Sequence, residues 1–189
     1  MPVDGSELAG SLLVAMPQLQ DPNFRRAVVL LVEHDESGTF GLVLNRPTDV
    51  SVATLCSSLD VDWAGEPNLE IQWGGPVQPN TGWVVFNENL ALSGDEEGVA
   101  ELERGRFCAG SLDGLKAIAR TPPSDVLVCV GYAGGGPGQL ESEMATGAWL
   151  VAPLSAETVF DVEHDEMWMH VVRGLGVDPA TLVSTSGIH

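Results

Sequence analysis

The stretch Gly131-Tyr-Ala-Gly-Gly-Gly-Pro-Gly-Gln-Leu-Glu-Ser-Glu143 organises the rest of this chain. It follows Asp125-Val-Leu-Val-Cys-Val130, a short apolar run rich in β-branched residues that is typical of a buried strand. Pro137 stands where a helix can begin, and Leu140 and Met144 then lie four residues apart on one helical face. We therefore predict a strand, a glycine-rich loop and a short helix.

Two interpretations of the glycine-rich loop are open. Its bare amides and the helix N-terminus that follows would suit an anion. The known phosphate-binding motifs do not fit, because Pro137 and Gly138 replace the Lys and the Ser or Thr of a Walker A loop. Gln139 likewise occupies the third glycine position of Gly-x-Gly-x-x-Gly. We favour the other interpretation, a tight structural crossover packed against a neighbouring segment.

The composition indicates one acidic globular domain over residues 1–189. Hydrophobic residues make up 44% of the chain, which is enough for a real core. The chain has 27 Asp and Glu against 8 Lys and Arg, a net charge of −19. Such a surface repels phosphate backbones, and the only basic pair in the sequence is Arg25-Arg26. Direct nucleic-acid binding is therefore disfavoured.

The cysteines and the N-terminal residues indicate a reducing compartment. Cys56, Cys108 and Cys129 are odd in number and form no Cys-x-x-Cys, so we predict buried free thiols and no zinc site. The first residues are acidic where a signal peptide would be basic, and no apolar run approaches about 20 residues. We predict a cytoplasmic location and no membrane partner.

Strands and helices alternate along the chain. The clearest element is a hairpin of residues 27–33 and 39–45, followed by a helix that Ser51 caps. Residues 69–73 and 83–86 are predicted strands joined by a broad hairpin connection, and 88–106 is a predicted loop with Phe107 returning to the sheet. Further helices are predicted after Ser111, Ser155 and Asp165. Two early strands form a hairpin and are therefore antiparallel, which a doubly wound parallel sheet would not contain. We therefore predict an α+β fold with a mixed sheet.

Two ionisable side chains are candidates for catalysis. His34 ends a predicted buried strand and can act as a general base, although a histidine there more often closes a turn. Glu141 lies in the first turn of a predicted helix, where negative charge also suits the helix dipole without any function. The histidines lack metal-ligand spacing, and neither Gly-x-Ser-x-Gly nor His-Glu-x-x-His is present. We predict no metal and no cofactor.

Polar residues at strand ends are the candidates for ligand binding. Asn45 and Arg46 end the second strand of the hairpin, and the Arg46 guanidinium can either clamp a carboxylate or phosphate or pair with one of the many acids. Tyr132, the only tyrosine, can hold a ligand through its hydroxyl or can complete the core. Gln139 can orient a substrate, or it can simply begin the helix.

A series of motifs in this chain matches a known family. In order, they are Gly10-Ser-Leu-Leu-Val-Ala-Met-Pro17, Asp21-Pro-Asn-Phe24, Val28-Val-Leu-Leu-Val-Glu-His34, Gly41-Leu-Val-Leu-Asn-Arg-Pro47, Gly74-Gly-Pro-Val77, Gly131-Tyr-Ala-Gly-Gly-Gly-Pro-Gly-Gln-Leu-Glu141 and Trp149-Leu150. Over nearly the whole chain this series resembles the YqgE/AlgH family of bacterial proteins. The resemblance implies a bifurcated mixed sheet curled into a pseudo-barrel with helices outside.

The resemblance implies less about function, because the family is largely uncharacterised. One member's name links it to control of alginate production, and a role in transcriptional regulation is often assigned. Members usually carry Trp after Gly-Tyr-Ala-Gly, where this chain has Gly135. If that indole lines a pocket in relatives, the pocket of this protein is wider.

These observations lead to one main hypothesis and two alternatives. We predict a small ligand-binding or regulatory protein whose pocket is formed by Asn45-Arg46, Gly75-Pro76 and the loop from Tyr132 to Glu141, Gly134 and Gln139 included. Its partner would be a small molecule or another protein. The first alternative is a hydrolase or transferase that acts on a small anionic molecule with His34 or Glu141 as the base. The second alternative is direct DNA binding, which the net charge of −19 disfavours most strongly.

Overall fold

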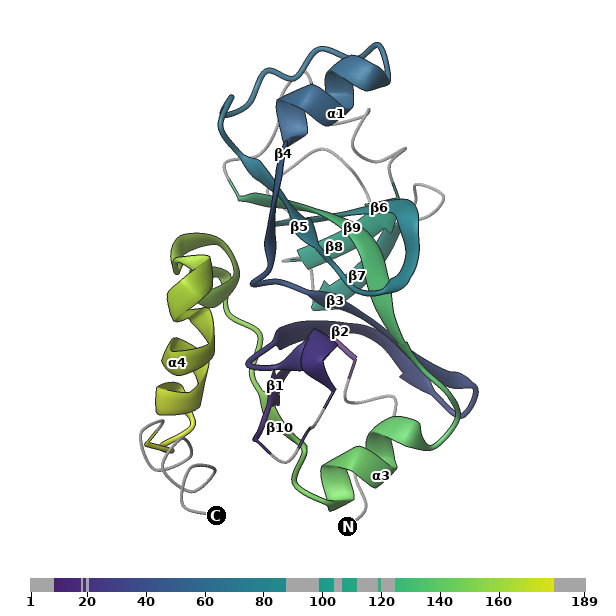
Figure 1. The fold of residues 1–189 in the computed structure, drawn as a ribbon, viewed down its shortest axis with the longest axis vertical. Coiled ribbons are helices and arrows are strands. Elements are labelled where there is room, and N and C mark those ends of the chain that lie inside the picture. The colour runs from purple at the N-terminus through teal and green to yellow at the C-terminus, as the bar shows by residue number, and fades with distance from the viewer. Residues whose placement is uncertain are drawn as a thin grey trace.

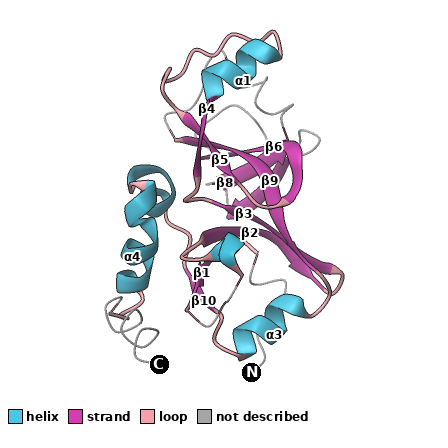
Figure 2. Cartoon of the chain, viewed as in Figure 1, coloured by secondary structure: helices cyan, strands magenta, loops and turns pink. Residues whose placement is uncertain are grey.

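The computed structural model describes residues 9–17, 19, 21–87, 99–103, 107–111, 119 and 125–178. Ten strands form one sheet, and short helices pack around it (Figures 1 and 2). In chain order the elements are β1 (Leu12–Ala15), η2 (Pro22–Phe24), β2 (Val28–Asp35), β3 (Gly38–Val43), β4 (Pro47–Ser51), α1 (Val52–Ser58), β5 (Glu70–Trp73), β6 (Val77–Asn87), β7 (Val99–Glu103), β8 (Phe107–Ser111), β9 (Val126–Gly135), α3 (Gln139–Ala145), β10 (Trp149–Ala152), η3 (Glu157–Asp161) and α4 (His164–Gly174).

The sheet is mixed and branches at β9. Its main path runs β10-β1-β2-β3-β9-β6-β8-β7, and β5, which carries β4, pairs with β9 off this path. The β5–β9 pair is parallel, whereas all the other pairs in the described residues are antiparallel. The predicted α+β fold with a bifurcated sheet is therefore confirmed. Among the described strands β10 and β7 each pair on one side only, so the sheet implied to curl into a pseudo-barrel does not close into a barrel.

The branch point explains the glycines of the sequence. Gly74 lies between two strands: its carbonyl accepts from the Val43 amide at 2.8 Å, and its amide donates to the Val130 carbonyl at 2.8 Å. A Cβ on Gly75, which has φ +154°, would lie 2.1 Å from the Tyr132 carbonyl carbon. A Cβ on Gly131 would lie 2.3 Å from the Gly75 oxygen. At Gly131 the stretch therefore crosses tightly against residues 74–75, because only glycine allows these backbones to approach so closely.

Two details of the predicted strand-loop-helix unit were wrong. The strand β9 continues through Gly135, since residues 133–135 pair with β3, so the loop is confined to residues 136–138. The helix α3 begins at Gln139 rather than at Pro137, with Gly138 at its N-cap in the left-handed region at φ +76°. A run of glycines looks like a loop in sequence, yet here it pairs as a strand because β3 supplies the missing hydrogen-bond partners.

Three apolar clusters fill the two faces of the sheet. Along β2, Val28, Leu30 and Val32 belong to the cluster that packs against α4, whereas Val29 and Leu31 belong to the cluster that includes residues of α3 and β10. This explains why the strand is apolar on both faces. The third cluster packs α1 against β5, β6 and β9. In Figure 1, α4, α3 and α1 accordingly lie at three different sides of the sheet.

Most of the predicted local elements are present in the described residues. The hairpin of β2 and β3 is confirmed, and so is the Ser51 cap of α1, in which the Thr54 amide lies 3.1 Å from the serine Oγ. The helix predicted to open at Asp165 is present, but it begins at His164 with Glu163 at its N-cap. The segment after Ser155 is helical, but as a π-helix over Glu157–Asp161. The predicted helix after Ser111 lies outside the described residues.

The predicted hairpin of residues 69–73 and 83–86 was wrong. Both β5 and β6 pair with β9, one parallel and one antiparallel, so the glycines between them lie at the branch point and not in a hairpin turn. Part of the predicted loop 88–106 is the strand β7, and β8 begins at Phe107 as expected. No helix in the described ranges is long and apolar enough to cross a bilayer.

Candidate functional site

Two pockets among the described residues divide the predicted site. Asn45 and Arg46 line one pocket, Gly134 and Gln139 line the other, and Gly75, Pro76 and Tyr132 line neither. The prediction that these residues share one pocket was wrong because of the direction of the strands. Since β9 runs antiparallel to β3, Gly135 lies opposite Thr39, at the start of β3. Asn45 and Arg46 follow the other end of that strand. Whether these residues bind a ligand stays a prediction.

We call the larger pocket the arginine groove. It has a volume of about 510 Å³ and lies between the end of η2, the residues that follow β3 and the N-terminal part of α4. It is lined by Pro22, Arg25, Arg26, Asn45, Arg46, His164, Asp165, Trp168 and Met169.

The arginine groove concentrates positive charge. Three of the four basic side chains in the described part of the chain line it, namely Arg25, Arg26 and Arg46, whereas the fourth, Arg173, does not. The Arg46 guanidinium donates a hydrogen bond to the Arg25 carbonyl, and the Arg26 guanidinium lies 5.1 Å from the centre of the Trp168 ring. Partial burial lowers the pKa of Arg46 from its usual value, but an arginine remains charged at neutral pH.

Asn45 supports the arginine groove from inside the protein. Its Oδ1 accepts from the Val28 amide at 3.0 Å, and its Nδ2 donates to the Arg26 carbonyl at 2.9 Å. The side chain is buried, and both ends of its amide are used within the protein. Asn45 therefore fixes the backbone at Arg26, which adopts a left-handed φ of 54°.

His164 lies at the other side of the arginine groove and is linked to the sheet. Its Nε2 lies 3.1 Å from the Nε2 of Gln72, a buried side chain of β5. The Gln72 amide donates in this arrangement, so the proton of a neutral His164 lies on Nδ1. That nitrogen is buried and has no hydrogen-bond partner among the described residues.

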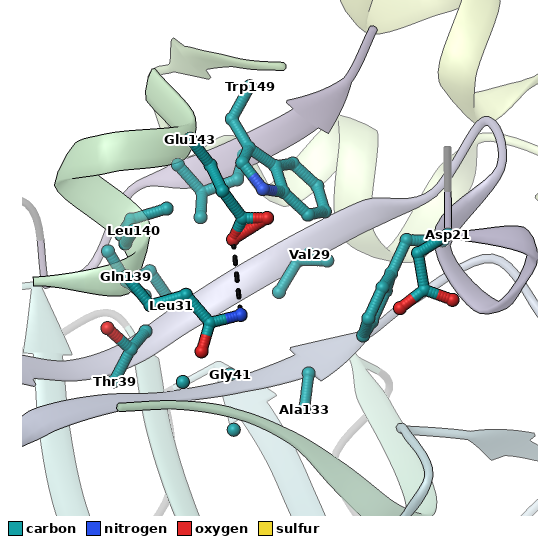
Figure 3. A pocket seen from close by; sticks show the side chains of 14 residues that line it. Asp21, Val29, Leu31, Thr39, Gly41, Ala133, Gln139, Leu140, Glu143 and Trp149 are labelled. Atoms are coloured by element: carbon teal, nitrogen blue, oxygen red, sulfur yellow. Dashed lines mark hydrogen bonds between the residues drawn. The ribbon is translucent and has the colours of Figure 1, made fainter. Parts of the chain in front are cut away.

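We call the smaller pocket the hairpin pocket, because it lies over the β2–β3 hairpin under α3 (Figure 3). Its volume is about 70 Å³, room for only a small group. It is lined by Leu13, Asp21, Phe24, Val29, Leu31, Thr39, Gly41, Ala133, Gly134, Gly135, Gln139, Leu140, Glu143 and Trp149.

Gln139 forms part of the polar wall of the hairpin pocket. Its Oε1 accepts from the Gly136 amide at 3.1 Å, and its Nε2 lies 3.4 Å from Glu143 Oε1, the contact drawn in Figure 3. A Cβ on Gly135 would lie 3.5 Å from the Thr39 Cβ and 3.7 Å from the Gln139 Oε1. The tryptophan that the family resemblance leads one to expect at this position would therefore start inside the pocket.

The two candidate catalytic residues lie side by side behind the hairpin pocket and do not line it. The His34 ring is buried, its Nδ1 lies 2.8 Å from Thr39 Oγ1, and its Nε2 lies 3.4 Å from Glu141 Oε1. The imidazole and the threonine face each other because His34 and Thr39 are directly paired across the hairpin. Glu141 approaches from α3, and its side chain is largely exposed.

Tyr132 belongs to an aromatic cluster. Its ring centre lies 4.7 Å from that of Phe40 and 6.1 Å from that of Trp83. Phe40 and Trp83 also pack edge to face at 4.7 Å. This geometry stabilises the region where β9 passes from β6 to β3.

Sequence reasoning missed the partners that complete both pockets. The sequence shows Arg25 and Arg26 only as a basic pair, and it shows Thr39 only as part of a predicted strand. The two-residue turn between Asp35 and Gly38 could have shown that Thr39 faces His34, since a hairpin turn sets the register. No comparable signal links Arg25 to Arg46, because their proximity depends on how the chain enters β2 and leaves β3.

The cysteines of the described residues are buried. Cys56 and Cys129 are buried free thiols, as predicted, and burial raises the pKa of Cys129 to about 12. The Cys108 side chain lies outside the described residues. No three His, Cys, Asp or Glu side chains in the described ranges come together as metal ligands.

Comparison with known proteins places the chain in a family. A family model described as DUF179, AlgH-like, matches residues 12–180. A UPF0301 protein of Myxococcus xanthus is 40% identical over 183 residues, which cover 96% of this chain and 98% of that protein. A UPF0301 protein of Anaeromyxobacter dehalogenans is 40% identical, and the match covers 99% of this chain and 98% of that protein.

Two solved structures share the fold. The solution structure of the AlgH protein from Pseudomonas aeruginosa has a TM-score of 0.75 and 35% identity, covering 97% of this chain and 95% of that one. The crystal structure of a protein from Corynebacterium diphtheriae has a TM-score of 0.71 at 24% identity, covering 92% and 94%, and supports the fold alone. The chain belongs to the AlgH-like family.

Proposed function

We propose that this protein binds a small polyanion, carrying phosphate or carboxylate groups, in the arginine groove, and that it acts as a regulatory binding protein. The observation that supports the proposal is the distribution of charge. Three of the four basic side chains in the described part of an otherwise acidic chain line one pocket. Such a concentration of charge needs a counter-charge, and only Asp165 supplies a carboxylate among the residues that line the groove.

The chemistry of the groove suits an anion of metabolite size. A guanidinium presents its donors in a planar fork that matches carboxylate and phosphate oxygens. The volume of about 510 Å³ lies within the range of roughly 300 to 1,000 Å³ that is typical of small-molecule sites.

The charge of the whole protein favours a small ligand over a nucleic acid. A duplex would bring many phosphates against a chain of net charge −19, whereas a small polyanion meets only the groove. A regulatory role would therefore act through the ligand or through a protein partner. Direct readout of DNA is disfavoured by the same argument.

We expect Arg46→Gln to weaken the binding of inorganic pyrophosphate by about 10-fold or more, because hydrogen bonds to charged groups contribute about 1.5–3 kcal/mol. Isothermal titration calorimetry of the full chain at low salt measures this directly. Arg173→Gln is the matched control, since it removes an equal charge from the C-terminal end of α4, outside the groove. Equal loss in both variants, or no binding by the unaltered protein, would contradict the proposal.

A further inference from the structure

A threonine hydroxyl at the hairpin pocket is coupled to a buried imidazole. Thr39 lines the pocket, and its Oγ1 lies 2.8 Å from His34 Nδ1, within hydrogen-bond distance. On the far side of the ring, His34 Nε2 lies 3.4 Å from a Glu141 carboxylate oxygen. These three groups come from β3, β2 and α3, so the fold brings them together.

His34 Nε2 is buried and forms no hydrogen bond among the described residues, and the Glu141 carboxylate lies 3.4 Å from it. An ionised Glu141 can only accept, so the neutral ring places its proton on Nε2 and leaves a lone pair on Nδ1. In this tautomer Thr39 donates its hydroxyl proton to His34 Nδ1. An imidazole lone pair on a hydroxyl is the arrangement that activates an alcohol as a nucleophile.

The hydroxyl of Thr39 is accessible because residue 135 is glycine. A Cβ at that position would lie 3.7 Å from Thr39 Oγ1, so a longer side chain would extend over the pocket.

The walls of the hairpin pocket limit the substrate. Apolar side chains, among them Leu31, Leu140 and Trp149, form most of the lining, and the volume of about 70 Å³ admits only a short group. Asp21 and Glu143 add carboxylates, which disfavour an anionic substrate. A small uncharged acyl group fits these conditions.

We propose that Thr39 is the nucleophile of an acyl-transfer reaction on small uncharged esters, with His34 as general base and Glu141 as a positioning residue. The Thr39 Oγ attacks the acyl carbonyl while its proton moves to His34 Nδ1. The bond to the leaving alcohol then breaks, and His34 returns the proton to that alcohol. Water, deprotonated by the same nitrogen, releases the acid and restores Thr39. This site shares no lining residue with the arginine groove and does not depend on it.

The test is acylation of the full chain by p-nitrophenyl acetate. We expect one acetyl group on Thr39 by peptide mass spectrometry, together with release of p-nitrophenolate. Thr39→Val should abolish that adduct, and His34→Gln should slow p-nitrophenolate release by about 100-fold or more, the usual range for loss of a general base. Ser37→Ala is the matched control, because Ser37 is a hydroxyl on the same hairpin that bonds Asp35 instead of a histidine. It should react like the unaltered protein.

Two further variants separate chemistry from folding. Gly135→Leu leaves all three reacting side chains in place but covers the Thr39 hydroxyl, so labelling should fall with an unchanged circular dichroism spectrum. Glu141→Gln, on an exposed side chain, should lower kcat with little change in KM. Acetyl groups found only on lysine, cysteine or the N-terminus, or an undiminished rate in Thr39→Val, would overturn the proposal.

Discussion

Gly75→Ala is expected to lower the free energy of unfolding by about 3–5 kcal/mol, among the largest effects of a single methyl group. The added Cβ would lie 2.1 Å from the Tyr132 carbonyl carbon and 2.3 Å from the Ala133 amide nitrogen. Both are backbone atoms of β9, so no side chain can move aside. The backbone at Gly75, with φ +154°, is also one that side-chain-bearing residues rarely adopt. Urea unfolding followed by tryptophan fluorescence measures the loss.

The matched control for Gly75→Ala is Gly136→Ala in the loop before α3. No heavy atom lies within 4 Å of a Cβ built at that position, and the residue is exposed. We expect a change within about 0.5 kcal/mol. If both glycines tolerated alanine equally well, the close crossing of β9 with residues 74–75 would not be the feature that organises the sheet.

Trp168→Ala is expected to cost about 3–5 kcal/mol in the free energy of unfolding. The indole is buried in the cluster between α4 and the sheet, and its Nε1 donates to the Ala15 carbonyl at 2.8 Å. The same ring lies beneath the Arg26 guanidinium, so its loss should also weaken pyrophosphate binding in the arginine groove. Urea unfolding and calorimetry on one preparation measure both effects.

Trp168→Phe separates the two contributions of this residue. Phenylalanine keeps most of the buried area but leaves the Ala15 carbonyl without its donor, which costs about 1–3 kcal/mol. An aromatic face stays available to Arg26. We therefore expect reduced stability with nearly unchanged binding. If Trp168→Phe weakened pyrophosphate binding as much as Trp168→Ala does, the aromatic face beside Arg26 would not be what the indole contributes to binding.

The hairpin and the helices of this fold could be predicted, because each depends on a pattern of neighbouring residues in the sequence. The β2–β3 hairpin follows from two apolar runs around a turn, and α1 and α4 follow from helical spacing with Ser51 and Gly176 at their ends. The long β6 and the parallel β5–β9 pair were not predictable from local patterns. Their existence depends on partners far away in the chain, and Pro79 within β6 argues against a strand.

The candidate sites were predictable only in part, for the same reason. Arg46 and Asn45 were singled out because they follow a strand, and they do line a pocket. Their expected neighbour, the glycine-rich segment, pairs with the opposite end of β3 instead. The antiparallel pairing of β3 and β9 therefore separates the glycine-rich segment from Asn45 and Arg46. Arg25 lies next to Arg46 only in the folded chain.

The most direct measurement of the central claim is a crystal structure of the protein grown with pyrophosphate. We expect electron density for the anion in the groove, with its oxygens within hydrogen-bond distance of the guanidinium groups of Arg25 and Arg46. Density for the anion at another surface, or a groove that holds only water at saturating pyrophosphate, would contradict the assignment of this groove as the binding site.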